Sequence, residues 1–428
     1  MFVHSPITPR VSRLRQLHRD STPTLDADRT RIITEYYRQS MYEVPIIRRA
    51  KACYEILTKM TIRVEPDELI VGNVGKYFRG VNVWAEYGLD WLIRDFDSGA
   101  FDTMENCGSD FIMPQEDRDY IRSVADFWRE NGNEARIGKC VPDDINYVSH
   151  AHVTPHNPGM CASVPHGHYN ANYRKVVEKG FGAIKKEALE HIEELRGNIW
   201  GKDAEKWFFY HAVVICCDAA IAFSKRFAAE CRRQADECTD EKRKAELLQM
   251  ADSLDWIMEN PCRTYWEACQ AIYFYHLILN IEGSYLGITI GRFDQQAGDY
   301  LEADLAAGRL TMEQAQEITD CFCLKVADMM VSGSKFMMHQ FSYSNNMRLT
   351  LSGRKPDGTD ATNTCTYMCL QTIARLKLHD PTLSLCVHKD TPAELWEAGI
   401  ETAKICGGIP TLDNTDLVIV ILHKRGLS

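Results

Sequence analysis

Residues 283–295 read GSYLGITIGRFDQ and join a long apolar segment to a short polar turn. Upstream, residues 265–281 are mostly apolar, and this composition predicts a helix buried inside a large protein. Residues 286–290 are mainly apolar and lie between Gly283 and Gly291, so they suit a short strand. This order of helix, strand and turn indicates an α/β fold.

The turn at Gly291–Gln295 allows two interpretations. Arg292 and Asp294 could form the paired charge that a turn in a protein interior requires. Alternatively, Arg292 could bind the carboxylate of a substrate, because a guanidinium group matches a carboxylate with two hydrogen bonds. From the residues alone we favour the structural role for Gly291, Arg292, Asp294 and Gln295.

Most of the remaining chain has helical periodicity, and alternating apolar residues predict strands over 347–351 and 382–388. Few strands among many helices predict a helix-rich α/β fold with its sheet at the centre. Capping-box patterns mark three helix starts, at Thr264, Thr311 and Thr391. Further helices are predicted over residues 29–60 (interrupted near Pro45), 185–196, 207–236 and 241–258.

Composition excludes several classes of protein. The 428 residues contain 60 acidic and 49 basic side chains, a net charge of −11, which argues against binding to nucleic acid or an anionic membrane. No secretory signal or membrane span is predicted, and residues 265–281 are the nearest approach to a span. Sixteen cysteines without disulfide-scaffold spacing indicate a reduced, cytoplasmic protein.

Histidine and cysteine clusters are candidate sites of chemistry. Five histidines lie between His150 and His168 in a segment rich in Gly and Pro, where they could bind a metal or line a pocket; the spacing matches no common zinc motif and favours the pocket. The pairs Cys321 with Cys323 and Cys365 with Cys369 could bind metal or undergo redox chemistry. Their apolar, helical surroundings instead predict core positions, as for the Cys216–Cys217 pair.

Several strings in this chain resemble, in order, those of the glycyl radical enzymes, the pyruvate formate-lyase-like lyases, dehydratases and decarboxylases. GRFDQ is the most specific of them. The strings are Arg49-Ala50, TIRVEPDELIVGN at 61–73, Gly167-His168 before YRKVVEKG at 173–180, WEACQ at 266–270, GRFDQ at 291–295 with Asp304 and GRLT at 308–311, and GIP at 408–410 before Asn414.

The resemblance implies a ten-stranded α/β barrel of two half-barrels wrapped by helices. It also implies a backbone glycyl radical that takes hydrogen from a cysteine, whose thiyl radical then abstracts hydrogen from the substrate. Cleavage of a C–C, C–O, C–N or C–S bond follows. An S-adenosylmethionine-dependent iron–sulfur activase installs the radical, and this chain itself is expected to bind no cofactor.

The family's Gly-Cys-Val-Glu and Arg-Val-x-Gly-Tyr strings are absent from residues 1–428, and Cys386-Val387 is followed by His388. The resemblance therefore implies an N-terminal arm (1–28) and a domain (29–428) that stops before the catalytic cysteine. This chain would be the substrate-binding half of the enzyme. Its expected partners are a small-molecule substrate, the activase, the C-terminal half and, in the complete protein, a second copy of itself.

The resemblance also suggests which residues line the substrate pocket. In glycerol-type diol dehydratases a His-Ser pair before the Gly-Arg motif binds hydroxyl groups, and Leu286 and Gly287 stand at those positions here, a change that disfavours a diol. Trp84-Ala85-Glu86 replaces a common Pro-Glu pair. The candidate pocket residues are His166, His168, Ser284, Tyr285, Leu286 and Gly287.

Two other functions remain open from the sequence. The chain could be a non-catalytic split subunit or pseudo-enzyme that binds a partner or small ligand, or a metal-binding protein that uses the histidines at 150–168. A half-barrel ending near residue 428 would expose a strand edge and an apolar face. We therefore expect the isolated chain to aggregate or dimerise.

Overall fold

The computed structural model describes residues 5–99, 111–140, 142, 170–283, 287–330 and 347–426. Helices make up most of this part of the chain. The helices are α1 (Pro9–Asp20), α2 (Asp28–Ser40), α3 (Pro45–Lys59), α4 (Asp90–Asp97), α6 (Gln115–Asn131), α7 (Asn133–Gly138), α10 (Tyr173–Leu195), α11 (Asp203–Glu237), α12 (Glu241–Trp256), α13 (Tyr265–Glu282), α14 (Phe293–Ala306), α15 (Met312–Ala327), α17 (Thr364–Leu376), α18 (Ala393–Cys406) and α19 (Thr415–Lys424). The strands are β1 (Thr24–Asp26), β2 (Gly80–Asn82), β3 (Gly291–Arg292), β4 (Arg348–Ser352), β5 (Thr382–Val387) and β6 (Thr411–Asn414).

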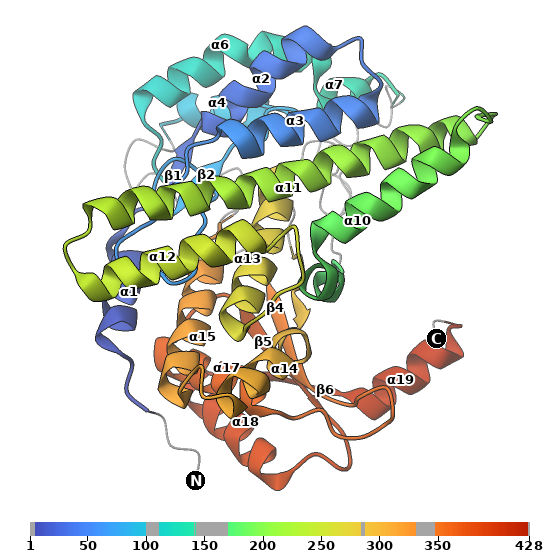
Figure 1. Cartoon of the computed structure of the whole chain (residues 1–428). Helices are drawn as coiled ribbons and strands as arrows, with labels where there is room; N and C mark the ends of the chain where they lie inside the picture. The colour runs from blue at the N-terminus through green and yellow to red at the C-terminus, as the bar shows by residue number, and fades with distance from the viewer. Residues whose placement is uncertain are drawn as a thin grey trace.

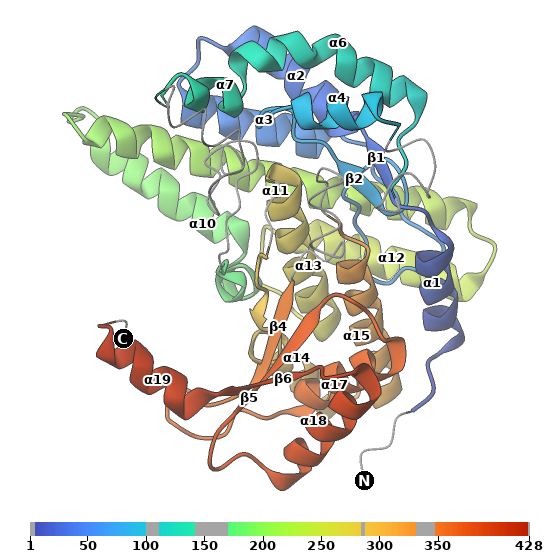
Figure 2. The same cartoon turned by 180° about the vertical axis from the view of Figure 1, so that it is seen from behind.

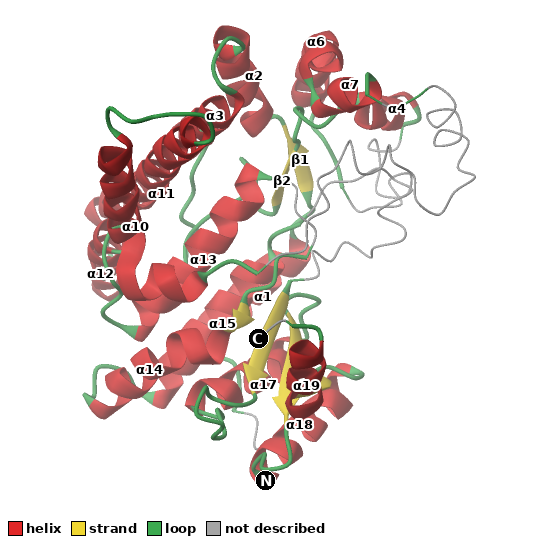
Figure 3. Ribbon diagram, turned by 90° about the vertical axis from the view of Figure 1, so that its right-hand side faces the viewer, coloured by secondary structure: helices red, strands yellow, loops and turns green. Residues whose placement is uncertain are grey.

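Two parallel sheets lie in different parts of the fold (Figure 3). β1 pairs with β2 near the N-terminal helices, and β3, β4, β5 and β6 pair in that order. Leu349 of β4 lies opposite Leu383 of β5, and both side chains are fully buried. Because parallel strands need crossover connections, helices lie between successive strands of the larger sheet. This arrangement confirms the predicted helix-rich α/β class.

Two of the three predicted strands are confirmed. The strands predicted at 347–351 and 382–388 correspond to β4 and β5. The strand predicted at 286–290 is misplaced, because β3 begins only at Gly291. Among the described residues of that range, Thr289 alone makes an isolated bridge, to Asn170.

Long helices cover the upper part of the molecule in Figure 1. α11 is 35 residues long and packs along α3, α10 and α12. Within the described ranges it is also the one helix long and apolar enough to cross a membrane, and 39% of its apolar window is buried in this fold. The helix predicted to be buried is confirmed as α13, in which 14 of 18 residues are buried.

Only one of the three predicted capping boxes is complete. At Thr311 the hydroxyl accepts the Gln314 N–H and the Gln314 side chain accepts the Thr311 N–H. Thr264 caps α13, but the carboxylate of Glu267 binds Arg263 instead. The third box is wrong, because the Thr391 hydroxyl accepts the His388 N–H and α18 begins after Pro392.

The predicted N-terminal arm contains a helix that is fixed to the rest of the fold. α1 packs against α15, and its Val11 is fully buried. Arg13 forms a two-point ion pair with Asp67, at 2.7 Å for both contacts. His18 lies 2.6 Å from the carboxylate of Asp328, at the end of α15. Residues 9–26 therefore fold together with the remainder of the chain.

The last elements of the chain lie at an open edge of the larger sheet. β6 is the terminal strand of this sheet, and α19 extends away from it (Figure 2). None of the residues of α19 is buried. The exposed apolar residues of this edge, here called the α19 apolar surface, are Leu412, Leu417, Val418, Ile419, Val420, Ile421 and Leu422.

Most of the described cysteines occupy core positions, as predicted. Cys321, Cys323, Cys365 and Cys369 are buried, and their side chains lie in the main hydrophobic core. Cys217 is buried as well. The expectation for Cys216 is wrong, because this residue is exposed.

Candidate functional site

Five of the six candidate pocket residues lie outside the described part of the chain: His166, His168, Ser284, Tyr285 and Leu286. The sixth, Gly287, is buried and has a φ of 81°, a left-handed conformation that favours glycine. The histidines at 150, 152 and 156 also lie outside it. Among the residues that the structure does describe, no group of His, Cys, Asp and Glu could hold a metal ion.

The end of α13, just before Ser284, is held in place by side chains from earlier in the sequence. The last carbonyl groups of α13 have no partner within the helix, and three side chains from earlier in the sequence donate to them. Arg29 donates to the Ile281 oxygen at 2.7 Å and to the Glu282 oxygen at 3.0 Å. Arg49 also donates to the Glu282 oxygen, and the Trp84 indole donates to the Ile281 oxygen at 3.3 Å. We call Arg29, Arg49 and Trp84 the α13 clamp.

Glu86 balances the positive charge of the α13 clamp. Its carboxylate accepts two hydrogen bonds from Arg29, at 2.6 and 2.9 Å, and one from Arg49 at 2.7 Å. Burial alone raises the pKa of Glu86, but the two guanidinium groups outweigh this effect and lower it to about 2. Glu282 pairs with Arg49 as a second carboxylate. Arg29 and Arg49 of the clamp thus form a partly buried ion-pair network with Glu86 and Glu282.

An isolated β-bridge joins the residue that follows the histidine segment to the residues just before the GRFDQ motif. Asn170 is the first described residue after the segment that contains His166 and His168, and it pairs in parallel with Thr289. Gly291, with a φ of 81°, lies beside it. A Cβ atom at position 291 would lie 3.1 Å from the Asn170 side-chain oxygen, a tight contact that adds to the preference for glycine set by φ.

The GRFDQ motif fixes the chain on the C-terminal side. Arg292 donates to the Ser352 oxygen at 2.6 Å and to the Arg354 oxygen at 2.8 Å. Asp294 accepts the Ser352 N–H at 2.6 Å. Gln295 donates to the Ala361 oxygen at 2.7 Å. Arg292 and Asp294 thus do not pair with each other, contrary to the structural interpretation from the sequence: both bind the backbone of Ser352 instead.

The backbone of Ser352 explains this arrangement. Its φ of 58° is unfavourable for a residue with a side chain, and the turn needs external support. Asp294 is fully buried and also accepts a hydrogen bond from the Thr366 hydroxyl at 2.6 Å. Burial raises the pKa of Asp294 to about 6, although Thr366 and the Ser352 N–H oppose the rise. The motif therefore holds the turn that follows β4.

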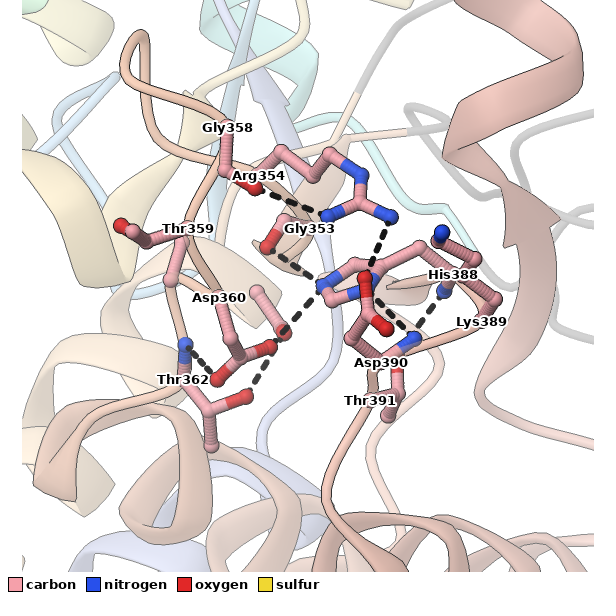
Figure 4. A network of polar contacts seen from close by, with 12 residues as sticks. Gly353, Arg354, Gly358, Thr359, Asp360, Thr362, His388, Lys389, Asp390 and Thr391 are labelled. Atoms are coloured by element: carbon pink, nitrogen blue, oxygen red, sulfur yellow. Dashed lines mark hydrogen bonds and ion pairs between the residues drawn. The ribbon is translucent and has the colours of Figure 1, made fainter.

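A second polar network joins the loops at the ends of β4 and β5 (Figure 4). The Nε2 atom of His388 lies 3.1 Å from the Gly353 oxygen and 3.0 Å from Asp360. Its Nδ1 atom accepts the Asp390 N–H at 3.2 Å, so the geometry assigns the proton to Nε2. The His388 side chain is 0% exposed, and its contacts join the loops after β4 and β5.

Arg354 extends this network to α19. Its guanidinium group donates to Asp416 at 2.7 Å, to Asp390 at 3.0 Å and to the Gly358 oxygen at 2.8 Å. Ligands of parallel α/β sheets commonly bind at the carboxyl ends of the strands. Here the polar groups of Figure 4 bind one another, and they order this end of the sheet.

Sequence reasoning missed the clamp residue Arg29 and the supporting role of Trp84. A signal was nevertheless present in the sequence. A buried apolar helix that ends at Glu282-Gly283 leaves carbonyl groups without donors, and the predicted helix over residues 29–60 begins with an arginine. Which donors meet which carbonyls depended on the tertiary fold.

Comparison with known proteins gives consistent results. A family model described as pyruvate formate lyase-like matches residues 7–428. Isethionate sulfite-lyase of Nitratidesulfovibrio vulgaris is 31% identical over 432 residues, which cover 97% of this chain and 51% of that protein. Isethionate sulfite-lyase of Desulfovibrio desulfuricans is 29% identical, with 98% and 51% covered.

The fold is also that of a solved relative. The B12-independent glycerol dehydratase from Clostridium butyricum superposes with a TM-score of 0.92 at 29% identity, covering all of this chain and 53% of that structure. The chain therefore spans about half the length of the relatives it matches, and its four-stranded sheet is part of a glycyl radical enzyme barrel. The match over residues 7–428 shows that the chain belongs to the pyruvate formate lyase-like family of glycyl radical enzymes.

Proposed function

We propose that this chain is the substrate-binding half of a glycyl radical lyase or dehydratase that cleaves a bond in a small metabolite. One observation carries the proposal: the segment that leads from α13 to β3 is fixed at both ends by residues of this chain. Arg29 and Arg49 fix it before position 284, and Arg292 and Asp294 fix it after position 290. A site that positions a reactive substrate requires such rigid support.

We further propose that the pocket is lined by His166, His168, Ser284, Tyr285, Leu286 and Gly287. Leu286 and Gly287 offer no side-chain hydrogen bonds to a substrate, so a vicinal diol would gain little there. The relatives include isethionate sulfite-lyases and a glycerol dehydratase. Of these two kinds of substrate we therefore propose the sulfonate, isethionate, with cleavage of a C–S bond, because the residues at 286 and 287 disfavour a diol.

The radical machinery would come from a C-terminal half. The reaction of the family is started by hydrogen abstraction from the substrate by a thiyl radical, and the strings that carry the cysteine and the radical glycine match no residues here. The open edge of β6 and the α19 apolar surface offer a place for that half to pack. A radical-installing activase and a homodimer of the complete protein belong to the same proposal.

Coexpression tests this function. The chain would be produced anaerobically with the polypeptide encoded directly downstream and with a candidate activase. After S-adenosylmethionine is added, electron paramagnetic resonance measures the glycyl radical, and a colorimetric assay measures sulfite released from isethionate. We expect a radical signal and sulfite, with little aldehyde formed from glycerol. Aldehyde from glycerol with no sulfite from isethionate would contradict the proposed substrate.

The same experiment separates the enzyme from a non-catalytic subunit. If no downstream reading frame encodes the Gly-Cys-Val-Glu and Arg-Val-x-Gly-Tyr strings, this polypeptide has no catalytic half of its own. A stable complex that forms no radical would likewise identify the chain as a binding subunit or pseudo-enzyme.

A further inference from the structure

One face of the four-stranded sheet is polar where β4 and β5 begin. Along β4, Leu349 and Leu351 are fully buried, whereas Arg348 is exposed and Thr350 is half-buried. Because successive side chains of a strand point to opposite faces, Arg348 and Thr350 share the face that the leucines do not occupy. Thr382 of β5 lies opposite Arg348 in the parallel register and is half-buried. We call Arg348, Thr350 and Thr382 the β4–β5 polar face.

The side chains of this face are free to bind a ligand. Within the described part of the chain, none of the three makes a side-chain hydrogen bond or an ion pair. The other arginines near the candidate site are already engaged. The guanidinium groups of the α13 clamp bind Glu86, that of Arg292 binds two backbone oxygens, and that of Arg354 binds two aspartates. Arg348 differs from them because its positive charge is unpaired.

The backbone places Arg348 beside the segment that leads from α13 to β3. Its carbonyl oxygen accepts the N–H of Ile290 at 3.1 Å. Gly287, the described member of the proposed pocket, precedes Ile290 by three residues, so the two Cα atoms are at most about 11 Å apart. This separation is comparable to the combined length of an arginine side chain and a two-carbon metabolite.

The proposed pocket needs a positive charge that its own residues do not supply. None of its six candidate residues carries a permanent positive charge. Burial of a sulfonate or carboxylate without a counter-charge is strongly unfavourable. A guanidinium group donates several hydrogen bonds in one plane, and threonine hydroxyl groups are further donors, so the β4–β5 polar face has the groups that such an anion requires.

We propose that the β4–β5 polar face binds the anionic group of the substrate, a sulfonate or a carboxylate, with Arg348 as its main ligand. The guanidinium group binds two oxygens of the anion, and the hydroxyl of Thr350 or Thr382 donates to another. This inference rests on the proposed function, because it takes the substrate to bind near Gly287. It adds a residue that determines specificity for charge.

Equilibrium dialysis of the full chain against radiolabelled isethionate measures this site, whatever the oligomeric state of the chain. Two unlabelled competitors separate charge from shape. The first, 3-hydroxypropionate, has a carboxylate in place of the sulfonate, and the second, 2-hydroxyethyl methyl sulfone, has no charge. We expect both anions to bind and the sulfone to compete at least about tenfold more weakly. The tighter of the two anions identifies the group that the face prefers.

Variants assign the binding to Arg348. Arg348→Gln should weaken isethionate binding by about 10- to 100-fold, because the hydrogen bonds of a charged group are lost. Arg348→Lys keeps the charge and should retain part of the affinity. Arg19→Gln removes an exposed arginine from α1 and is the matched control, which should bind as the wild type does. Equal affinity in Arg348→Gln and the wild type would overturn the proposal, as would a wild-type chain that binds neither anion.

Further results distinguish this site from the function on which it rests. Anion binding that depends on Arg348, in a chain that forms no radical with its downstream half, would keep the site and reject the enzyme. Radical and product formed with an unchanged KM in Arg348→Gln would keep the enzyme and reject the site. If Arg348→Gln instead weakened the complex of the two halves without changing anion affinity, its partner would be a carboxylate of the C-terminal half, and the proposal would be wrong.

Discussion

The variant Asp294→Asn keeps the size and hydrogen bonds of this residue of the GRFDQ motif but removes its negative charge. The carboxylate of Asp294 accepts hydrogen bonds at 2.6 Å from the Ser352 N–H and from the Thr366 hydroxyl. An asparagine oxygen can accept the same two bonds, and the side chain has the same size. Only the ionisation of the buried group is lost. The variant therefore tests whether burial, which raises the pKa of Asp294 to about 6, controls the stability of this turn.

The size of the effect follows from the linkage between protonation and folding. A pKa that rises from 3.8 in the unfolded chain to about 6 in the folded chain corresponds to about 3 kcal/mol. The folded state favours the protonated carboxyl of Asp294. Its contribution of about 3 kcal/mol to the free energy of unfolding is therefore fully present below pH 3.8 and is lost as the pH rises through 6. Between pH 5 and 7.5, the free energy of unfolding of the wild type should fall by about 1.4 kcal/mol relative to Asp294→Asn.

Urea unfolding at pH 5, 6 and 7.5, followed by circular dichroism, measures this difference. We expect the two curves of stability against pH to diverge, with Asp294→Asn gaining on the wild type as the pH rises. Asp294→Ala is the control, because it leaves the Ser352 N–H and the Thr366 hydroxyl without an acceptor and should cost about 2–5 kcal/mol at every pH. Parallel curves for the wild type and Asp294→Asn would show that the carboxylate stays ionised in the fold, and would refute the reasoning.

Three further sets of substitutions have definite expected outcomes. Glu68→Gln leaves the buried Lys325 ammonium, now 2.6 Å from the Glu68 carboxylate, without its counter-charge; urea unfolding should show a loss of about 3–5 kcal/mol, most of it recovered when Lys325→Met is added. Thr311→Ala should lower the free energy of unfolding by about 1 kcal/mol, whereas Thr311→Ser keeps the cap and should match the wild type. In sedimentation velocity, Ile419→Lys with Ile421→Lys should shift the isolated chain from larger species toward monomer, and a monomeric wild type would contradict an adhesive α19 apolar surface.

The sequence predicted features that depend on neighbours along the chain. Thr311 and Gln314 are three residues apart, and their reciprocal cap formed as expected. The alternating residues of β4 and β5 and the apolar run of α13 were equally local signals. Thr391 shows the limit of such signals, because its hydroxyl was taken by the N–H of His388, which the turn after β5 brings close.

The site depended on contacts that no local pattern encodes. Arg292 and Asp294 looked like a pair because they are only two residues apart in the sequence, yet both bind Ser352, about 60 residues later. The α13 clamp joins Arg29 to Ile281, a separation of 252 residues. Charge and spacing identified these residues as important, but only the fold identified their partners. The prediction that Cys216 is buried was wrong because neighbouring residues of a helix point in different directions: Cys217 is buried, whereas Cys216 is exposed.

The contacts that support the proposed pocket join distant parts of this chain. Among the described residues, side chains from Arg29 near the beginning of the chain to Asp294 fix the two ends of the segment between Glu282 and Gly291. The polar network around His388 and Arg354 likewise orders the loops after β4 and β5 from within the chain. If the pocket proposed above is correct, exchange of this half between relatives should transfer substrate preference while the radical machinery stays the same.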